Sequence, residues 1–130
     1  MSKQHRFFKG FFYAGRGIIH GLKNEQNLVF HLIFAVLVIV AGIFFQISKV
    51  EWLILVLCFM IVPSLELLNS AIEETCDRLR DDLGLPYKAT QWPRDLAAGA
   101  VLWSAIGSMV IGLIIFLPHV FEFATALLAQ

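Results

Sequence analysis

The chain has 130 residues, of which 58% are hydrophobic and only 15% are charged. This composition is far from that of an ordinary soluble domain, so we expect one membrane-embedded domain over residues 1–130. Ten basic and ten acidic side chains leave no formal net charge. Without a basic surplus to neutralise phosphates, the chain is not expected to bind nucleic acid.

The first predicted element is a surface helix over about residues 6–23. Basic and polar side chains recur there at steps of three and four residues, while phenylalanine, isoleucine and leucine take the other side. This is the pattern of an amphipathic helix that lies in the plane of the membrane interface.

Three apolar segments follow, each long enough to cross the hydrocarbon core as a helix of about 20 residues. They lie at about residues 28–45, 52–72 and 96–117. The first is too long for the core of a signal peptide, which spans about 7 to 15 residues, so we expect no cleavage. Pro63 is expected to kink the second span, and Pro93 and Pro118 to bound the third. Because a chain of this size has too few strands to close a barrel, the fold class is all-α.

Basic residues predict the orientation of the chain. Five precede the first span, four lie between the second and third spans, and only Lys49 lies elsewhere. Nine of the ten therefore fall on one side, which the positive-inside rule assigns to the cytoplasm. We expect a multi-pass protein with a cytoplasmic N-terminus and an outward-facing C-terminal tail.

An acidic stripe marks the cytoplasmic end of the second span. At about 100° per residue, Glu73 and Asp77 fall within roughly 20° of Glu66 on a helix, and Asn69 flanks them. An ionisable side chain at membrane depth is costly and usually marks an ion pathway or a reaction site. The alternative is that Glu66 only pairs with a basic residue of a neighbouring helix.

Glu25 lies at the same interface depth as Glu73, where the surface helix gives way to the first span. Two carboxylates at one depth are suitable ligands for Mg²⁺ with a nucleotide, although interface carboxylates are more often only solvated. Basic side chains at the same surface can hold a polyphosphate or bind anionic lipid head groups. No Walker-type phosphate loop, protein-kinase motif or G-x-S-x-G elbow occurs in the sequence.

These residues resemble a known family, the prokaryotic diacylglycerol kinases, whose signature is similar to E-x-x-N-S/T-A-I/V-E-x-x-x-D. Here the pattern reads Glu66, Asn69, Ser70, Ala71, Ile72, Glu73 and Asp77. The likeness extends to Tyr13-Ala14, Gly17, Glu25 and the run at residues 95–101, so it covers most of the chain in the same order.

The resemblance implies a lipid kinase in the bacterial cytoplasmic (inner) membrane. Its expected reaction is transfer of the γ-phosphate of ATP, with Mg²⁺, to the hydroxyl of diacylglycerol, which gives phosphatidic acid. The family also implies a homotrimer of three-span subunits with an N-terminal surface helix, in which the active sites form between neighbouring subunits.

Roles carry over to this chain position by position. Glu66 resembles the general base of the family and Asn69 its supporting partner, while Glu25 and Glu73 match the metal-binding pair. The expected cofactor-binding residues, including that pair, are Arg6, Tyr13, Glu25, Glu73, Asp77, Arg94 and Asp95. Two departures are visible: Arg94 replaces a usual lysine, which changes a point charge into a planar fork, and the segment at residues 78–93 is longer than in enterobacterial members.

Three alternatives stay open at this point. Asn27 with His31 is similar to an N-x-x-x-H pattern of the Gram-positive branch, many of whose members phosphorylate undecaprenol, although His31 is equally explained as a hydrogen-bonded packing residue. A small ion-conducting oligomer in which Glu66 relays a cation would explain Glu66 but not Glu25, Glu73 and Asp77. A family member that has lost catalysis is disfavoured by the intact Glu66, Asn69 and Glu73.

Overall fold

The computed structural model describes residues 3–129 and the side chains from residue 7 onward, and every regular element in that part is a helix. The helices are α1 (Lys3–Asn24), α2 (Gln26–Phe44), α3 (Lys49–Leu83) and α4 (Tyr87–Leu128). The last three are long and apolar enough to cross a membrane. The all-α prediction and the three spanning helices are therefore confirmed.

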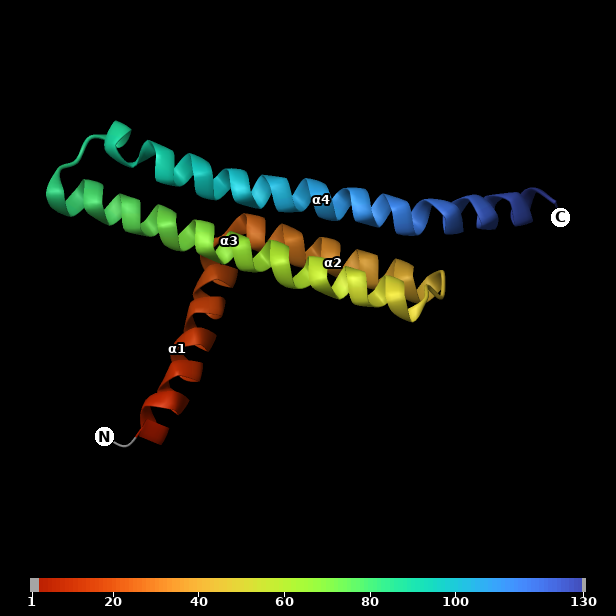
Figure 1. Cartoon of the computed structure of the whole chain (residues 1–130), viewed down its shortest axis with the longest axis horizontal. Helices are drawn as coiled ribbons and strands as arrows, with labels where there is room; N and C mark the ends of the chain where they lie inside the picture. Colours follow the sequence, from red (N-terminus) through yellow and green to blue (C-terminus); the bar gives the residue numbers. More distant parts are fainter. Residues whose placement is uncertain (1–2, 130) are drawn as a thin grey trace.

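The three long helices lie side by side, and α1 leaves them at a steep angle (Figure 1). α3 is the central helix, because it packs against both α2 and α4. α3 and α4 are antiparallel, and ion pairs join them near both ends: Asp77–Arg94 at 2.6 Å and Glu51–His119 at 3.3 Å. Figure 1 also shows that the α3–α4 hairpin extends well past the point where α1 joins α2.

The turn between α2 and α3 is closed by a capping box. The Glu51 carboxylate accepts a hydrogen bond from the Ser48 backbone N–H at 2.7 Å, and the Ser48 hydroxyl accepts one from the Glu51 N–H at 3.3 Å. These bonds satisfy donors that the first turn of any helix leaves without partners. Beside the turn, Gly42 is buried against the Trp52 ring. The close approach of α2 to α3 there depends on glycine, which has no side chain.

The α3–α4 connection is much shorter than the sequence predicted. Gly84 ends α3 in the left-handed conformation, with φ at 65°, and Pro86 precedes the first turn of α4. Glycine takes this conformation without the steric cost of a Cβ, which is why α3 ends there. The polar segment at residues 78–93 is therefore mostly helical and not an open loop.

The prolines do not end the helices, which extend beyond the predicted spans. α4 continues through Pro93 and Pro118 over 42 residues, and α3 continues through Pro63 over 35 residues. A proline removes one helical hydrogen bond, but neighbouring helices and local adjustment compensate for it within membrane helices. At about 1.5 Å per residue, α4 is about 63 Å long, roughly twice the hydrocarbon thickness of about 30 Å.

Only a small core is buried within one chain. Ile47, Leu55 and Ile115 pack together near the α2–α3 turn. Most other large apolar side chains of α2, α3 and α4 are exposed, Phe34 and Trp103 among them. Exposure of such an apolar surface to water is unfavourable, so this surface is suited to contact with lipid tails or with other chains.

Candidate active site

The acidic stripe of α3 begins in a buried environment. Glu66 is only 2% exposed and Asn69 only 7% exposed, whereas Glu73 and Asp77, further toward the C-terminal end of α3, are half-buried. Burial of an ionisable side chain without a charged partner is costly, so such a side chain is usually found where function requires it. Within the described side chains, the Glu66 carboxylate forms no hydrogen bond or ion pair. The alternative in which Glu66 merely pairs with a basic residue of its own chain therefore has no support in the structure.

Asn69 lies between Glu66 and Glu73 along α3 and bonds to Glu73. Its side-chain amide donates a hydrogen bond to Oε1 of Glu73 at 3.1 Å, one turn further along α3. Its carbonyl oxygen, Oδ1, is buried and has no hydrogen-bond partner among the described residues. A buried acceptor without a donor is uncommon in folded proteins, and one at this place is ready to accept a bond from a bound hydroxyl or from a second chain.

Glu25 lies at the junction of α1 and α2, at the position that precedes the first turn of α2. It lines a cleft of about 330 Å³ between α1 and α3, together with Ser70 and Glu74 of α3. Glu74 was not selected from the sequence, although it directly follows Glu73 and lies only 80° from Glu66 around the helix at about 100° per residue. The cleft is at the N-terminal end of α2.

A magnesium ion can be held here only with the help of other ligands. The described residues contain no group of three or more His, Cys, Asp or Glu side chains that would hold a metal alone. Mg²⁺ commonly takes just one or two carboxylates and completes its six ligands with phosphate oxygens and water. Glu73 fits that need, because only its Oε1 is engaged by Asn69, and Glu25 adds a second half-buried carboxylate.

A charged cluster joins α3 and α4 toward the C-terminal end of α3. Asp77 Oδ1 accepts a hydrogen bond from Arg94 at 2.6 Å and forms an ion pair with Arg80 at 3.0 Å. The bond from Arg94 holds the pKa of Asp77 below its ordinary value, and the same bond raises the pKa of Arg94. Both side chains therefore stay charged at neutral pH.

The predicted nucleotide-contacting residues do not all come together within one chain. Arg94 and Asp95 begin the apolar part of α4, and Asp95 accepts a hydrogen bond from Gln91 at 3.3 Å. Tyr13 is exposed on α1, which leaves the bundle on the side of α3 away from α4 (Figure 1). Arg6 is also in α1, but its side chain lies outside the described part of the structure.

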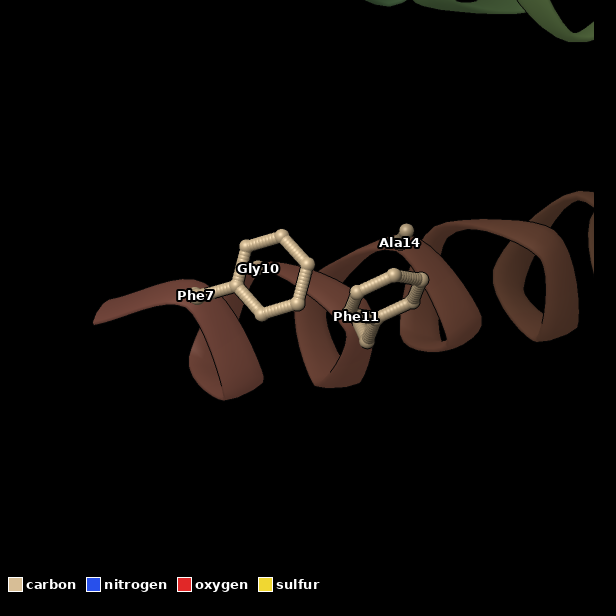
Figure 2. Close-up of a pocket in the computed structure, with 4 residues that line it drawn as sticks. All are labelled: Phe7, Gly10, Phe11 and Ala14. Atoms are coloured by element: carbon tan, nitrogen blue, oxygen red, sulfur yellow. The ribbon is translucent and has the colours of Figure 1, made fainter. Parts of the chain in front are cut away.

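A second hollow, on α1 itself, is chemically different. Figure 2 shows it between the rings of Phe7 and Phe11, over Gly10 and Ala14, with all four residues on one helix. Its lining has no charged or hydroxyl side chain. It therefore offers no group for catalysis, in contrast to the cleft that holds Glu25.

The sequence matches a known protein family over most of its length. The model of the prokaryotic diacylglycerol kinase family matches residues 12–116. An undecaprenol kinase of Bacillus subtilis is 44% identical over 122 residues, which is 90% of this chain and 97% of that protein. A diacylglycerol kinase of Synechocystis sp. is 32% identical over 109 residues, which is 83% of this chain and 61% of that protein. The family match includes every predicted site residue except Arg6.

Proposed function

This chain belongs to the prokaryotic diacylglycerol kinase family, and on that premise we propose that Glu66 and its neighbours transfer the γ-phosphate of ATP to a lipid alcohol at the cytoplasmic interface. Membership makes the protein a membrane lipid kinase with ATP and a lipid as its substrates. The observation that carries the assignment of the reaction centre is the buried carboxylate of Glu66, which has no cationic partner among the described side chains.

Phosphoryl transfer requires mainly positioning and charge neutralisation from the protein. In the proposed step the lipid hydroxyl oxygen forms a bond to the γ-phosphorus while the bond to the bridging oxygen of ADP breaks. Glu66 accepts the hydroxyl proton as the new bond between oxygen and phosphorus forms. ADP leaves with the electron pair of the broken bond. Asn69 fixes Glu73 through its amide and presents its free Oδ1 to the same region.

Charge on the phosphates needs cationic partners at the same place. Glu25 and Glu73 would hold Mg²⁺ against the phosphate oxygens, which neutralises charge that develops during transfer. Arg94, Asp95, Asp77, Tyr13 and Arg6 would bind the remainder of the nucleotide. Glu74, as a third carboxylate in the cleft with Glu25, is an additional candidate ligand.

The lipid acceptor is proposed to be undecaprenol, with diacylglycerol as the second candidate. The relative named undecaprenol kinase is 44% identical and is matched over 97% of its length. The relative named diacylglycerol kinase is 32% identical and is matched over 61% of its length. The chain also has Asn27 and His31, the N-x-x-x-H spacing of the Gram-positive branch, and His31 is half-buried on α2.

The working form is proposed to be a homotrimer in the bacterial cytoplasmic membrane, with the N-terminus in the cytoplasm and α1 on the membrane surface. Two observations support an assembly. α1, which carries Tyr13, and α4, which carries Arg94, lie on opposite sides of α3 (Figure 1), and a second chain could bring the two residues into one site. Most large apolar side chains of α2, α3 and α4 are also exposed, and so are the aromatic side chains of α1.

The rival from a different class is an ion-conducting oligomer in which Glu66 relays a cation. It accounts for a buried carboxylate but assigns no role to the Asn69–Glu73 bond or to Glu25. Kinase relatives that cover most of the chain argue against it.

The test is an assay of phosphate transfer by the purified protein in detergent micelles. Radiolabelled ATP and Mg²⁺ are supplied with undecaprenol or with diacylglycerol in separate reactions. Label should enter the lipid, and Glu66→Gln should lower kcat by about 10²- to 10⁴-fold, the usual contribution of a general base. Glu122→Gln, an exposed carboxylate at the opposite end of α4, is the matched control and should keep full activity. A Glu66→Gln protein that is folded and fully active would remove Glu66 from the chemistry.

A further inference from the structure

The start of α4 places an aromatic ring against the guanidinium of Arg94. The Arg94 Cζ lies 5.9 Å from the centre of the Tyr87 ring, within the range of a cation–π contact. The two residues are seven positions apart, so they lie on nearly the same face of the helix, about 20° apart at 100° per residue. Because helical side chains lean toward the N-terminus of their helix, Arg94 extends back over the Tyr87 ring.

Tyr87 is itself held by the local structure of the hairpin. Pro86, with its fixed φ, precedes the helix, and its carbonyl accepts a hydrogen bond from the Ala89 N–H at 2.9 Å. The Tyr87 carbonyl accepts a bond from the Thr90 hydroxyl at 3.2 Å, and Thr90 is only 4% exposed. The backbone that carries the ring is therefore fixed, although the ring is exposed on its other face.

The guanidinium of Arg94 is held at two points, and among the described residues only Asp77 accepts a hydrogen bond from it. Asp77 binds its Nη2 at 2.6 Å, and Tyr87 covers it from the side. The side chain is only 15% exposed, and its Nε is buried without a hydrogen-bond partner among the described residues. Arg80 binds the same oxygen of Asp77, so the carboxylate is shared between two cations. A guanidinium that is fixed in this way, with N–H donors left without partners among the described residues, is suited to donate hydrogen bonds to an anionic oxygen.

We propose that Tyr87 is a positioning residue that orients the Arg94 guanidinium for the phosphates of the nucleotide, so that part of the affinity for ATP depends on an aromatic ring at residue 87. This inference rests on the proposed function only in naming ATP as the anion. Tyr87 contacts no reacting atom and acts through Arg94. A planar guanidinium can lie against a ring and still donate from its edge, which an ammonium group cannot do.

The experiment compares ring and non-ring side chains at residue 87 in the full-length protein in micelles. Tyr87→Leu should raise the KM for ATP about 2- to 5-fold, the loss expected for a cation–π contact at a partly exposed site, while kcat stays within error. Tyr87→Phe keeps the ring and should match the unaltered protein. Equal KM values for Tyr87→Leu and the unaltered protein would overturn the inference, and so would a Tyr87→Phe protein as impaired as Tyr87→Leu.

Arg94→Lys supplies the second arm of the test. In that background Tyr87→Leu should have a smaller effect on KM, because an ammonium group is attracted to a ring but cannot lie flat against it as a planar guanidinium can. A Tyr87→Leu effect of the same size in both backgrounds would show that the ring acts elsewhere and would overturn the proposal. Tyr87→Trp, with a larger ring, is the reserve variant if Tyr87→Leu does not fold. A raised KM for ATP in folded Tyr87→Trp protein would also count against the proposal.

Direct ATP binding by calorimetry separates this inference from the proposed function. If the unaltered protein phosphorylates neither lipid, the proposed function fails for those lipids. The ring dependence of the Kd for ATP then decides the role of Tyr87: a Kd raised by Tyr87→Leu and not by Tyr87→Phe supports it. Equal Kd values, or no binding of ATP at all, overturn it.

Discussion

Asp77 and Glu66 lie on one face of α3 but have opposite environments. Asp77 forms ion pairs with two arginines, while Glu66 is buried with no such partner among the described residues. The sequence placed both on one stripe, because helical spacing depends only on residue number. It could not show which carboxylate is neutralised by α4, since the partner is 17 residues away along the chain.

The ion pair at Asp77 predicts a specific dependence of stability on pH. The pKa of Asp77 is lowered by the hydrogen bond from Arg94, so the pair stabilises the folded chain above the ordinary carboxyl pKa of about 3.9. That stability is lost as the pH falls through the lowered pKa of the folded state. The difference in Tm between the protein and Asp77→Asn should be constant from about pH 8 to pH 5 and should shrink below about pH 4.

Thermal unfolding in micelles, followed by circular dichroism, measures this difference. Asp82→Asn, an exposed carboxylate near the end of the same helix, is the control and should show no comparable gap. A gap that closes between about pH 6 and pH 7 would mean that a histidine, and not Asp77, controls the pH dependence.

Helix existence was predictable from the sequence, whereas helix ends were not. The apolar runs and the amphipathic N-terminal pattern located all four helices, because hydrophobic length and periodicity are properties of local sequence. Pro93 and Pro118 were taken as boundaries, yet α4 continues through both. Packing against α3 maintains α4 across these positions, and such a contact cannot be read from one segment alone.

Close packing at the α2–α3 turn gives a prediction for this pair of helices. A Cβ at Gly42 would lie 2.8 Å from the Trp52 ring and 3.0 Å from Ile47. Gly42→Ala should therefore destabilise the protein by about 1–3 kcal/mol, the usual cost of overpacking, because an indole ring cannot yield as a flexible chain end can. Thermal or denaturant unfolding measures the change.

Gly107→Ala is the matched control for this substitution. An added Cβ at Gly107, also in a spanning helix, meets nothing within 4 Å in the described structure. It should be neutral or slightly stabilising, since alanine has a higher helix propensity than glycine. If Gly42→Ala were as stable as Gly107→Ala, the turn would be looser than the structure shows.

At the scale of the whole molecule, the predicted site residues are carried by helices on opposite sides of α3. Glu25 lies at the α1–α2 junction, and Arg94 lies on α4, beyond α3 from α1 (Figure 1). The sequence placed all these residues at the cytoplasmic surface but could not assign them to one chain or to neighbours. Only the resemblance to an oligomeric family implied sites between subunits.

Mixed oligomers test whether sites are shared. Glu25→Gln and Arg94→Gln proteins should each be nearly inactive, whereas co-expressed subunits should recover activity if the two residues of a site come from different chains. Random mixing leaves both intact halves at one interface in four, so about one quarter of full activity is expected. Lipid phosphorylation by the co-purified mixture is the readout, and absence of recovery would place Glu25 and Arg94 in the same chain of each site.

The most direct test of the account is the stoichiometry of the reaction in lipid vesicles. The protein is reconstituted with undecaprenol and diacylglycerol, Mg²⁺ and ATP are added, and ADP, phosphorylated lipid and proton flux are measured together. We predict one phosphorylated lipid for each ADP formed, with no proton flux above that of Glu66→Gln vesicles. Proton flux that depends on Glu66 without lipid phosphorylation would contradict the assignment of a lipid kinase and support an ion pathway.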